Sequence, residues 1–362
     1  MSIVLANNTL LSFIAALDLS KNSGRDVYLK SDIPAHFGRY FSINEFSKIY
    51  LDNLGVWKKI STDQYVPYKN IEIYLNDKKS LEFKCDDQKA HNLGYIISEG
   101  VLLDAVSKCI NETKSIKEQN QQNFSATGDM NICSNINEPE NIKNLFKFKI
   151  KNYEQTALNI TFEHTNDNNR EPRQIFFNDE ILGLLPVDNN TYNLIWSMPN
   201  SFFSSMKTTS SNEMIKCLAE RVGFIVGDIG NIDIGKSFPL SSRHSNNYFF
   251  ENYILIGDAA HKYHPLAGLG LNMGIEDVAT LSYLLANNEN SKTVFYQYAI
   301  KRMSRAQSLQ HILDTIIVFH SSDLMPIKIK KKILDFFNET FYLKPKIIEN
   351  ATGLNNKDLV NL

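Results

Sequence analysis

The segment that most constrains the fold of this chain is residues 253–285, where an apolar strand, a glycine-rich loop and a helix follow one another. Residues 253–256 are typical of a buried strand that ends at Gly257-Asp258, and the helix begins near Asn272. Glycines let a ligand approach the backbone, and the N-terminus of a helix attracts negative charge. The pattern favours a nucleotide-binding α/β protein, although a tight turn that needs small residues would also select glycines.

The rest of the chain predicts a mixed α/β order with two kinds of sheet. Periodicity predicts strand, helix and strand at 3–5, 10–19 and 27–29, which is a βαβ unit, and then a helix at 46–54 and a strand at 71–75. Strand-like runs at 157–162, 174–177 and 192–197 have no helices between them and indicate an antiparallel sheet. From residue 278 the pattern is mostly helical. We therefore expect a Rossmann-like lobe, an antiparallel-sheet lobe and a C-terminal helical region.

Composition excludes several classes of function. The 362 residues carry a net charge of −2, so no global field would draw the chain onto nucleic acid. The four cysteines lack C-x-x-C spacing, which fits neither a zinc site nor a disulfide framework and favours a reducing compartment. Neither a signal peptide nor an apolar run of about 18 residues is evident, so we expect a cytoplasmic protein that does not span a membrane.

Two segments have a biased composition. Residues 111–144 are rich in Asn, Gln, Lys, Glu and Ser, which predicts a poorly ordered or loop-dominated insert with little chemistry. Residues 327–337 form a basic amphipathic stretch between the helix breakers Pro326 and Pro345. That stretch is either a solvated helix face or a peripheral contact with the inner face of a membrane.

The glycine-rich segment resembles a known flavin motif. The residues that match the second flavin motif of the para-hydroxybenzoate hydroxylase-like monooxygenases are Gly257-Asp258-Ala259-Ala260-His261, Pro265, Gly268, Gly270, Asn272, Gly274 and Asp277. The run from His264 to Gly268 is similar to that of the ubiquinone-biosynthesis hydroxylases within this superfamily. Shorter matches, among them Leu54-Gly55-Val56-Trp57 and Tyr298 with Arg302, extend the resemblance over most of the chain.

The resemblance implies a cofactor, a reaction and partners. It implies FAD, NAD(P)H as the electron donor, and hydroxylation by O₂ of a polyprenylated phenol in ubiquinone biosynthesis, in complex with other proteins of that pathway. The implied cofactor-binding residues are Arg39, Gly257, Asp258, Pro265, Gly268, Leu269, Gly270, Leu271 and Asn272. No catalytic residue or metal site is assigned. Leu182, Leu184, Leu185, Leu194, Ile195 and Trp196 would line an apolar substrate pocket or form an ordinary sheet core.

The resemblance also implies how the chain is divided. Residues 1–60, 89–150 and 245–290 would form a discontinuous FAD-binding lobe, residues 61–88 and 151–244 the substrate-binding sheet, and residues 291–362 the C-terminal helices.

The chain departs from the family pattern at its N-terminus. The family's G-x-G-x-x-G is here Ala6-Asn7-Asn8-Thr9-Leu10-Leu11, so all three glycines that allow a tight turn, pyrophosphate approach and close helix packing are missing. Leu11 would push the helix away, and the ribose-binding acid at the second strand is Lys30, with Asp32 two residues beyond. The Asp-Gly segment that lines the flavin region is reduced to residues 127–129, and Leu269 replaces a glutamine. The adenosine half of FAD should be held weakly.

These departures leave an alternative open. A non-catalytic paralogue with weak FAD binding could serve as a scaffold or lipid-binding partner of related hydroxylases. Arg39 lies where the family has an arginine near the flavin phosphates or ring, but could equally be a surface arginine. His261 and His264 lie near Asp258 without a complete metal-ligand set, so His264 is expected beside the flavin edge.

Overall fold

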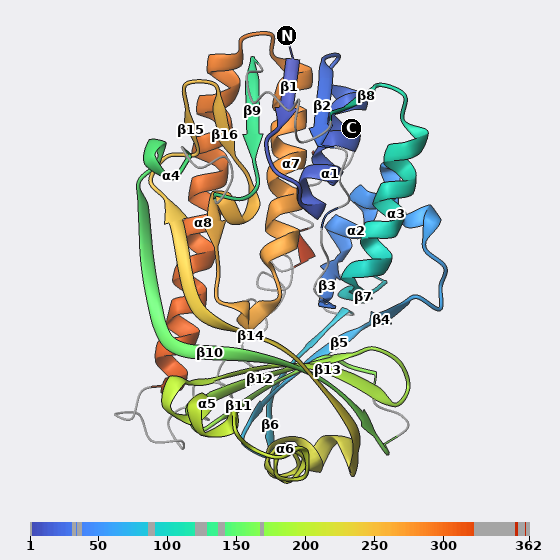
Figure 1. The fold of residues 1–362 in the computed structure, drawn as a ribbon, viewed down its shortest axis with the longest axis vertical. Coiled ribbons are helices and arrows are strands. Elements are labelled where there is room, and N and C mark those ends of the chain that lie inside the picture. Colours follow the sequence, from blue (N-terminus) through green and yellow to red (C-terminus); the bar gives the residue numbers. More distant parts are fainter. Residues whose placement is uncertain are drawn as a thin grey trace.

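The computed structural model describes residues 2–30, 34, 38–85, 91–119, 129–136, 142–166, 170–321, 352–353 and 359. Within them lie a six-stranded, an eight-stranded and a three-stranded sheet. In Figure 1 the six-stranded sheet and its helices form the upper part of the molecule, and the eight-stranded sheet crosses the lower part. The basic stretch at 327–337 lies outside the described residues.

The six-stranded sheet is a parallel Rossmann-like sheet with one antiparallel hairpin at its edge. Its order is β15 (Phe249–Phe250), β16 (Tyr253–Leu255), β9 (Met130–Cys133), β1 (Ser2–Leu5), β2 (Asp26–Lys30) and β8 (Ile116–Gln119). The crossover helix α1 (Leu10–Asn22) joins β1 to β2 as the sequence predicted. Strand β16, which carries the glycine-rich motif, shares this sheet with β1 through β9, as the βαβ pattern required.

Two strands contradict the prediction of a loop-dominated insert at 111–144, of which residues 120–128 and 137–141 lie outside the described residues. Strands β8 and β9 both lie within it, and β9 is the inner strand that joins β1 to β16. All four residues of β9 are buried, although polar residues surround the strand in the sequence. A strand this short, paired on both sides, needs few apolar residues, so composition averaged over the segment conceals it.

Helices cover the parallel sheet and bury its core. Helix α1 packs against α3 (Glu99–Glu112) and α7 (Gly270–Asn287), and α7 packs against α2 (Glu45–Asn53) and α8 (Ser291–Ser321). A three-stranded sheet of β3 (Tyr40–Asn44), β7 (Gly94–Ser98) and β4 (Tyr65–Tyr68) lies between the larger sheets in Figure 1. Among the described helices, none is long and apolar enough to span a membrane.

The eight-stranded sheet is antiparallel apart from one pair. Its order is β17 (His261–Lys262), β14 (Ile229–Ser245), β10 (Phe148–His164), β13 (Thr191–Pro199), β12 (Glu180–Pro186), β11 (Arg173–Phe177), β5 (Asn70–Leu75) and β6 (Lys78–Lys84). The antiparallel pairing of the strands at 157–162 and 192–197 is confirmed. Helices α5 (Asn200–Met206) and α6 (Ser211–Val226) lie below the sheet in Figure 1, and Met206, Met214, Leu218 and Val222 share its apolar core.

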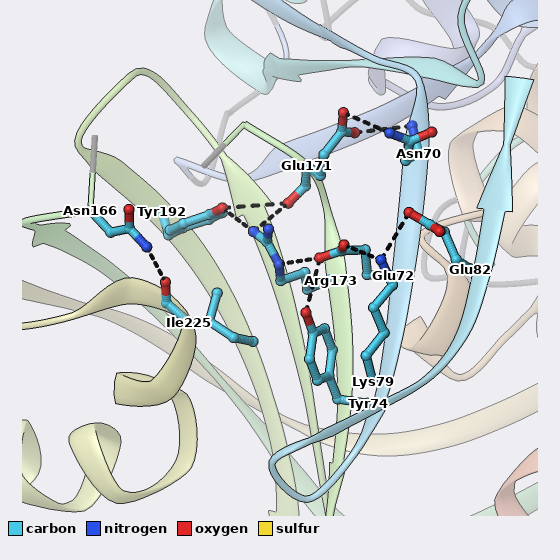
Figure 2. Close-up of polar contacts among 10 residues, drawn as sticks. All are labelled: Asn70, Glu72, Tyr74, Lys79, Glu82, Asn166, Glu171, Arg173, Tyr192 and Ile225. Atoms are coloured by element: carbon cyan, nitrogen blue, oxygen red, sulfur yellow. Dashed lines mark hydrogen bonds and ion pairs between the residues drawn. The ribbon is translucent and has the colours of Figure 1, made fainter. Parts of the chain in front are cut away.

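A polar network holds the one parallel pair, β5 and β11, together (Figure 2). Nε of Arg173 lies 2.7 Å from Oε2 of Glu72, and Nη1 of Arg173 donates to the hydroxyl of Tyr192 over 2.6 Å. Lys79 donates to the other Glu72 oxygen. Burial alone would raise the pKa of Glu72, but the Lys79 hydrogen bond and the Arg173 charge hold it below its ordinary value. The network thus fixes a hairpin that comes from a distant part of the sequence.

Candidate active site

The glycine-rich motif begins in a short 3₁₀ turn at the end of β16, made by Gly257–Ala259. Gly257 has a φ of 52°, in the left-handed region that favours glycine. The side chain of Asp258 is exposed at the strand end, and Nη2 of Arg243 donates to the Asp258 carbonyl over 2.6 Å. The turn therefore presents a carboxylate at the edge where ligands bind in open α/β sheets.

Asp277, on α7, holds this turn in place from inside the protein. Its Oδ2 accepts a hydrogen bond from the Gly257 N–H and lies 2.7 Å from Nε2 of His261, and its Oδ1 lies 2.5 Å from Nε of Arg302. Arg302 also donates to Glu276 over 2.9 Å. Burial alone would raise the pKa of Asp277, but the charges of His261 and Arg302 keep it below its ordinary value. Asp277 is therefore a buried carboxylate whose two oxygens are fully engaged in positioning.

The second half of the motif is the turn that leads into α7. Pro265 opens a 3₁₀ turn, and Gly268 closes it in the left-handed conformation with φ 59°. Nδ1 of His264 accepts a hydrogen bond from the Leu266 N–H, which leaves the proton on Nε2, 3.4 Å from Oε1 of Gln155. Burial lowers the pKa of His264 to about 4, so the ring is neutral at pH 7. His264 thus positions the loop, and nothing here places it as a proton donor.

Helix α7 begins at Gly270 without a side-chain cap from any described residue. The first N–H groups of a helix have no partner within the helix, so an uncapped N-terminus can donate to a ligand. Asn272 in this first turn accepts from the Asn44 N–H over 3.0 Å and donates to the Ser42 carbonyl over 2.8 Å. The motif is therefore fastened to strand β3.

Arg39 precedes β3 but is already paired. Its guanidinium forms a two-pronged ion pair with Glu99, and its side chain is 49% exposed. Its guanidinium also lies over the ring of Phe41. The role of Arg39 in cofactor binding stays a prediction.

The loop between β1 and α1 has no open cradle. Oδ1 of Asn7 accepts from the N–H groups of Ser134 and Asn135 over 2.7 and 2.9 Å. Thr9 caps α1, its hydroxyl accepting from the Ser12 N–H over 3.1 Å. The Ser134 hydroxyl lies 2.6 Å from that of Thr9 and 2.8 Å from that of Ser12. The chain's own side chains therefore join the carboxyl ends of β1 and β9.

The sequence suggested that Leu11 would push α1 away, but the structure accommodates its side chain. Its side chain lies over Gly257 and Gly274, where an added Cβ would come 2.4 and 2.7 Å from Leu11 Cδ2. Gly257 and Gly274, which have no side chains, thus leave the space that the Leu11 side chain takes up at the position where the family has a glycine. Lys30 ends β2, and Asp32 lies outside the described residues.

Of the segment at 127–129, only Asp129 is among the described residues, and it lies away from the glycine-rich motif. Residues 127–128 lie outside the described residues, and Asp129 precedes β9 and accepts from the Ser2 N–H at the start of β1. Asp129 is therefore at the amino edge of the sheet, opposite the glycine-rich motif. Ser134 and Asn135 occupy the carboxyl edge instead.

Most of the apolar residues expected to line a substrate pocket face away from the motif. Leu182, Leu184, Leu194 and Trp196 are fully buried in the core shared with α6. Alternation along a strand puts Gln155 and Asn159 of β10 on the opposite face, the one on which Gln155 meets His264. Leu185 also lies outside the α6 core, against the three-stranded sheet.

Several positioning residues could not be assigned from the sequence. Asp277 and Arg302 were recognised as matching residues without a role, and Glu276 was missed. Arg302 is 25 and 26 residues away from Asp277 and Glu276 in the sequence, so no local pattern reveals that they pair. Asn44 could have been found, since an Asn before Glu45-Phe46-Ser47 is a typical helix cap and its Oδ1 accepts from Ser47 N.

Comparison with known proteins finds similar FAD-dependent enzymes. Residues 141–311 match the model of an FAD binding domain. The 3-demethoxyubiquinol 3-hydroxylase of Escherichia coli strain K12 is 23% identical over 87% of each chain. Among solved structures, p-nitrophenol 4-monooxygenase PnpA of Pseudomonas putida has a TM-score of 0.73 at 13% identity, covering 99% of this chain and 97% of its own. Klebsiella pneumoniae HpxO, solved with FAD and uric acid, has a TM-score of 0.70 at 13% identity, covering 100% of this chain and 97% of its own.

The chain is similar to FAD-dependent monooxygenases in sequence and in fold, and residues 141–311 carry the match to the FAD binding domain. The match agrees with the resemblance seen in the sequence and supports FAD as the cofactor. The matched range contains Gly257 through Asn272 and the buried Asp277–Arg302 pair, but not the β1–α1 loop. The matched range thus covers the glycine-rich motif and leaves out the place of the N-terminal fingerprint.

Proposed function

We propose that this protein hydroxylates the ring of a polyprenylated phenol in ubiquinone biosynthesis, with FAD as cofactor, NAD(P)H as electron donor and O₂ as oxygen source. The observation that carries the proposal is that exposed Asp258 lies in a turn packed against α7, and that the α7 N-terminus at Gly270 has no side-chain cap from a described residue. The Escherichia coli relative, whose name describes a hydroxylase of demethoxyubiquinol, supports the substrate class.

The described residues fit the flavin half of FAD. Asp258 would accept hydrogen bonds from ribitol hydroxyls, and the first N–H groups of α7 at Gly270 and Leu271 would donate to a ring carbonyl. Gly268, in its left-handed conformation, leaves the approach free of a side chain. When bound, the flavin supplies the redox chemistry that activates O₂, and the protein supplies orientation and exclusion of water.

The face of the sheet toward the Pro265 loop supports recognition of a ring that bears polar groups. Gln155 and Asn159 carry amides on this face, and the Asn159 oxygen accepts from Asn193 Nδ2 over 2.7 Å. The α6 side holds Leu182, Leu184, Leu194 and Trp196. An amide can donate to or accept from a phenol hydroxyl. We therefore infer that these strands face the substituted ring and not the polyprenyl tail.

A non-catalytic role as scaffold or lipid-binding partner has one specific observation in its favour. The side chains of Asn7 and Thr9 already accept hydrogen bonds from the N–H groups of Ser134 and Ser12. They do so in the β1–α1 loop, where the family has its first fingerprint. A chain that holds no flavin would be left with this role.

The visible spectrum of the purified protein, before and after addition of FAD, tests the proposal. We expect a bound-flavin absorption band and NAD(P)H consumption that increases with a polyprenylated phenol. A Gly270→Pro variant removes one N–H at the start of α7, at a helix position that tolerates proline, and should bind flavin more weakly. A protein that stays colourless with excess FAD would contradict the proposal and leave the scaffold role.

A further inference from the structure

The crevice between β1 and β9 is where a dinucleotide would enter this fold. From β1 the chain crosses to β2 on one side, while β9 lies on the other, so the strand order reverses between β1 and β9. In open α/β sheets the pyrophosphate binds outside the carboxyl ends of the strands at such a point, against the N-terminus of the first helix. The state of this crevice therefore decides how the adenosine half of the cofactor is held.

The crevice is closed by the protein's own polar groups. Asn7, which is 1% exposed, bridges it through one oxygen that accepts from the N–H groups of both Ser134 and Asn135. At the start of α1, the hydroxyls of Thr9, Ser12 and Ser134 bond to one another. A phosphate would have to displace these bonds before it could make its own.

The remaining groups at this place do not favour a phosphate. Oδ1 of Asn8 is buried and has no partner among the described residues, and an amide oxygen accepts hydrogen bonds as phosphate oxygens do. Leu11 fills the space over Gly257 and Gly274 that the third fingerprint glycine would otherwise share. The helix that binds pyrophosphate in this fold is thus capped, whereas α7 is open at its N-terminus.

We propose that this protein binds its flavin through the isoalloxazine and ribitol alone, and that the pyrophosphate and adenosine contribute almost nothing to affinity. The inference rests on the proposed flavin function and names which part of the ligand is recognised. It follows that riboflavin, FMN and FAD are interchangeable ligands of the site. The closed crevice, and not a weakened cradle, is the cause.

Titration of the flavin-free full-length protein with riboflavin, FMN and FAD, followed by quenching of flavin fluorescence, tests this directly. We expect three dissociation constants within about tenfold of one another, a spread of about 1.4 kcal/mol. FAD binding at least a hundredfold tighter than FMN would overturn the inference while leaving the flavin function intact. Failure of all three flavins to bind would instead refute the flavin function and the inference together.

Two variants locate the binding energy on the protein. Asp258→Ala should weaken riboflavin, FMN and FAD by the same factor, because all three share the ribitol. Asn8→Ala is the matched control on the closed crevice, and it should change none of the three constants by more than about twofold. Selective weakening of FAD by Asn8→Ala would show that the adenosine half is held there and would overturn the inference.

Discussion

Replacing Arg302 by methionine should destabilise this protein more than any other single change near the motif. Arg302 is 3% exposed and bonds to Asp277, to Glu276 and to the Met273 carbonyl, over 2.5, 2.9 and 3.0 Å. Methionine keeps much of the volume but leaves buried Asp277 with His261 alone and buried Glu276 with only the more distant Arg305. Removing one partner of a buried ion pair costs about 3–5 kcal/mol, and we expect that loss in the free energy of unfolding.

Urea denaturation followed by circular dichroism measures this loss. The matched control is Arg305→Met on the same helix, where the side chain is 25% exposed and Nε lies 3.6 Å from Glu276. We expect a loss of at most about 1 kcal/mol there. Arg302→Lys keeps the charge without the fork and should fall between the two. An Arg302→Met protein within 1 kcal/mol of the parent would refute the view that this pair holds the Gly257 turn.

Further changes test other parts of the account. Asp258→Ala should lower FAD affinity about 5- to 150-fold, for loss of about 1–3 kcal/mol, and unchanged fluorescence titration would reject its assignment. Leu11→Ala should cost about 2–4 kcal/mol in urea unfolding through the void left over Gly257, and a neutral effect would show that the packing is loose. Burial lowers the pKa of His264 and His244 from 6.5 to about 4, so the unfolded state binds more protons between these values and stability falls as pH drops from 6.5 to 4. His264→Gln removes one of these two groups, so between neutral pH and pH 5 the variant should lose about 2 kcal/mol less free energy of unfolding than the parent. An unchanged pH dependence would contradict the burial of His264 as a neutral ring.

The sequence was sufficient for the parts of the fold whose signals are local. The strand before Gly257, the glycine loop and the start of α7 could be read because hydrophobic runs, glycines and helical spacing fall within one short segment. The crossover β1–α1–β2 was read for the same reason. By contrast, β9 was missed because its four buried residues are flanked by polar segments that dominated the composition.

The site was only partly predictable because several of its contacts join residues far apart in the sequence. Leu11 was expected to displace α1, since nothing local reveals that Gly257 and Gly274 lie against its side chain. Strand alternation separates Leu182 and Leu184 from Leu185, but it does not say which face meets α6. The bridge from Asn7 to Ser134 depended on β9, and could not be foreseen without that strand.

The most direct test of the central claim is oxygen transfer from labelled O₂. Purified protein loaded with FAD would be incubated with NADH or NADPH, a polyprenylated phenol and ¹⁸O₂, and the product analysed by mass spectrometry. We predict that one ¹⁸O atom enters the ring of the product, and that Asp258→Ala forms less product at an FAD concentration that just saturates the parent protein, in proportion to its lower occupancy. A flavin-loaded protein that consumes the reduced nicotinamide and O₂ but leaves every phenol unlabelled would contradict the account.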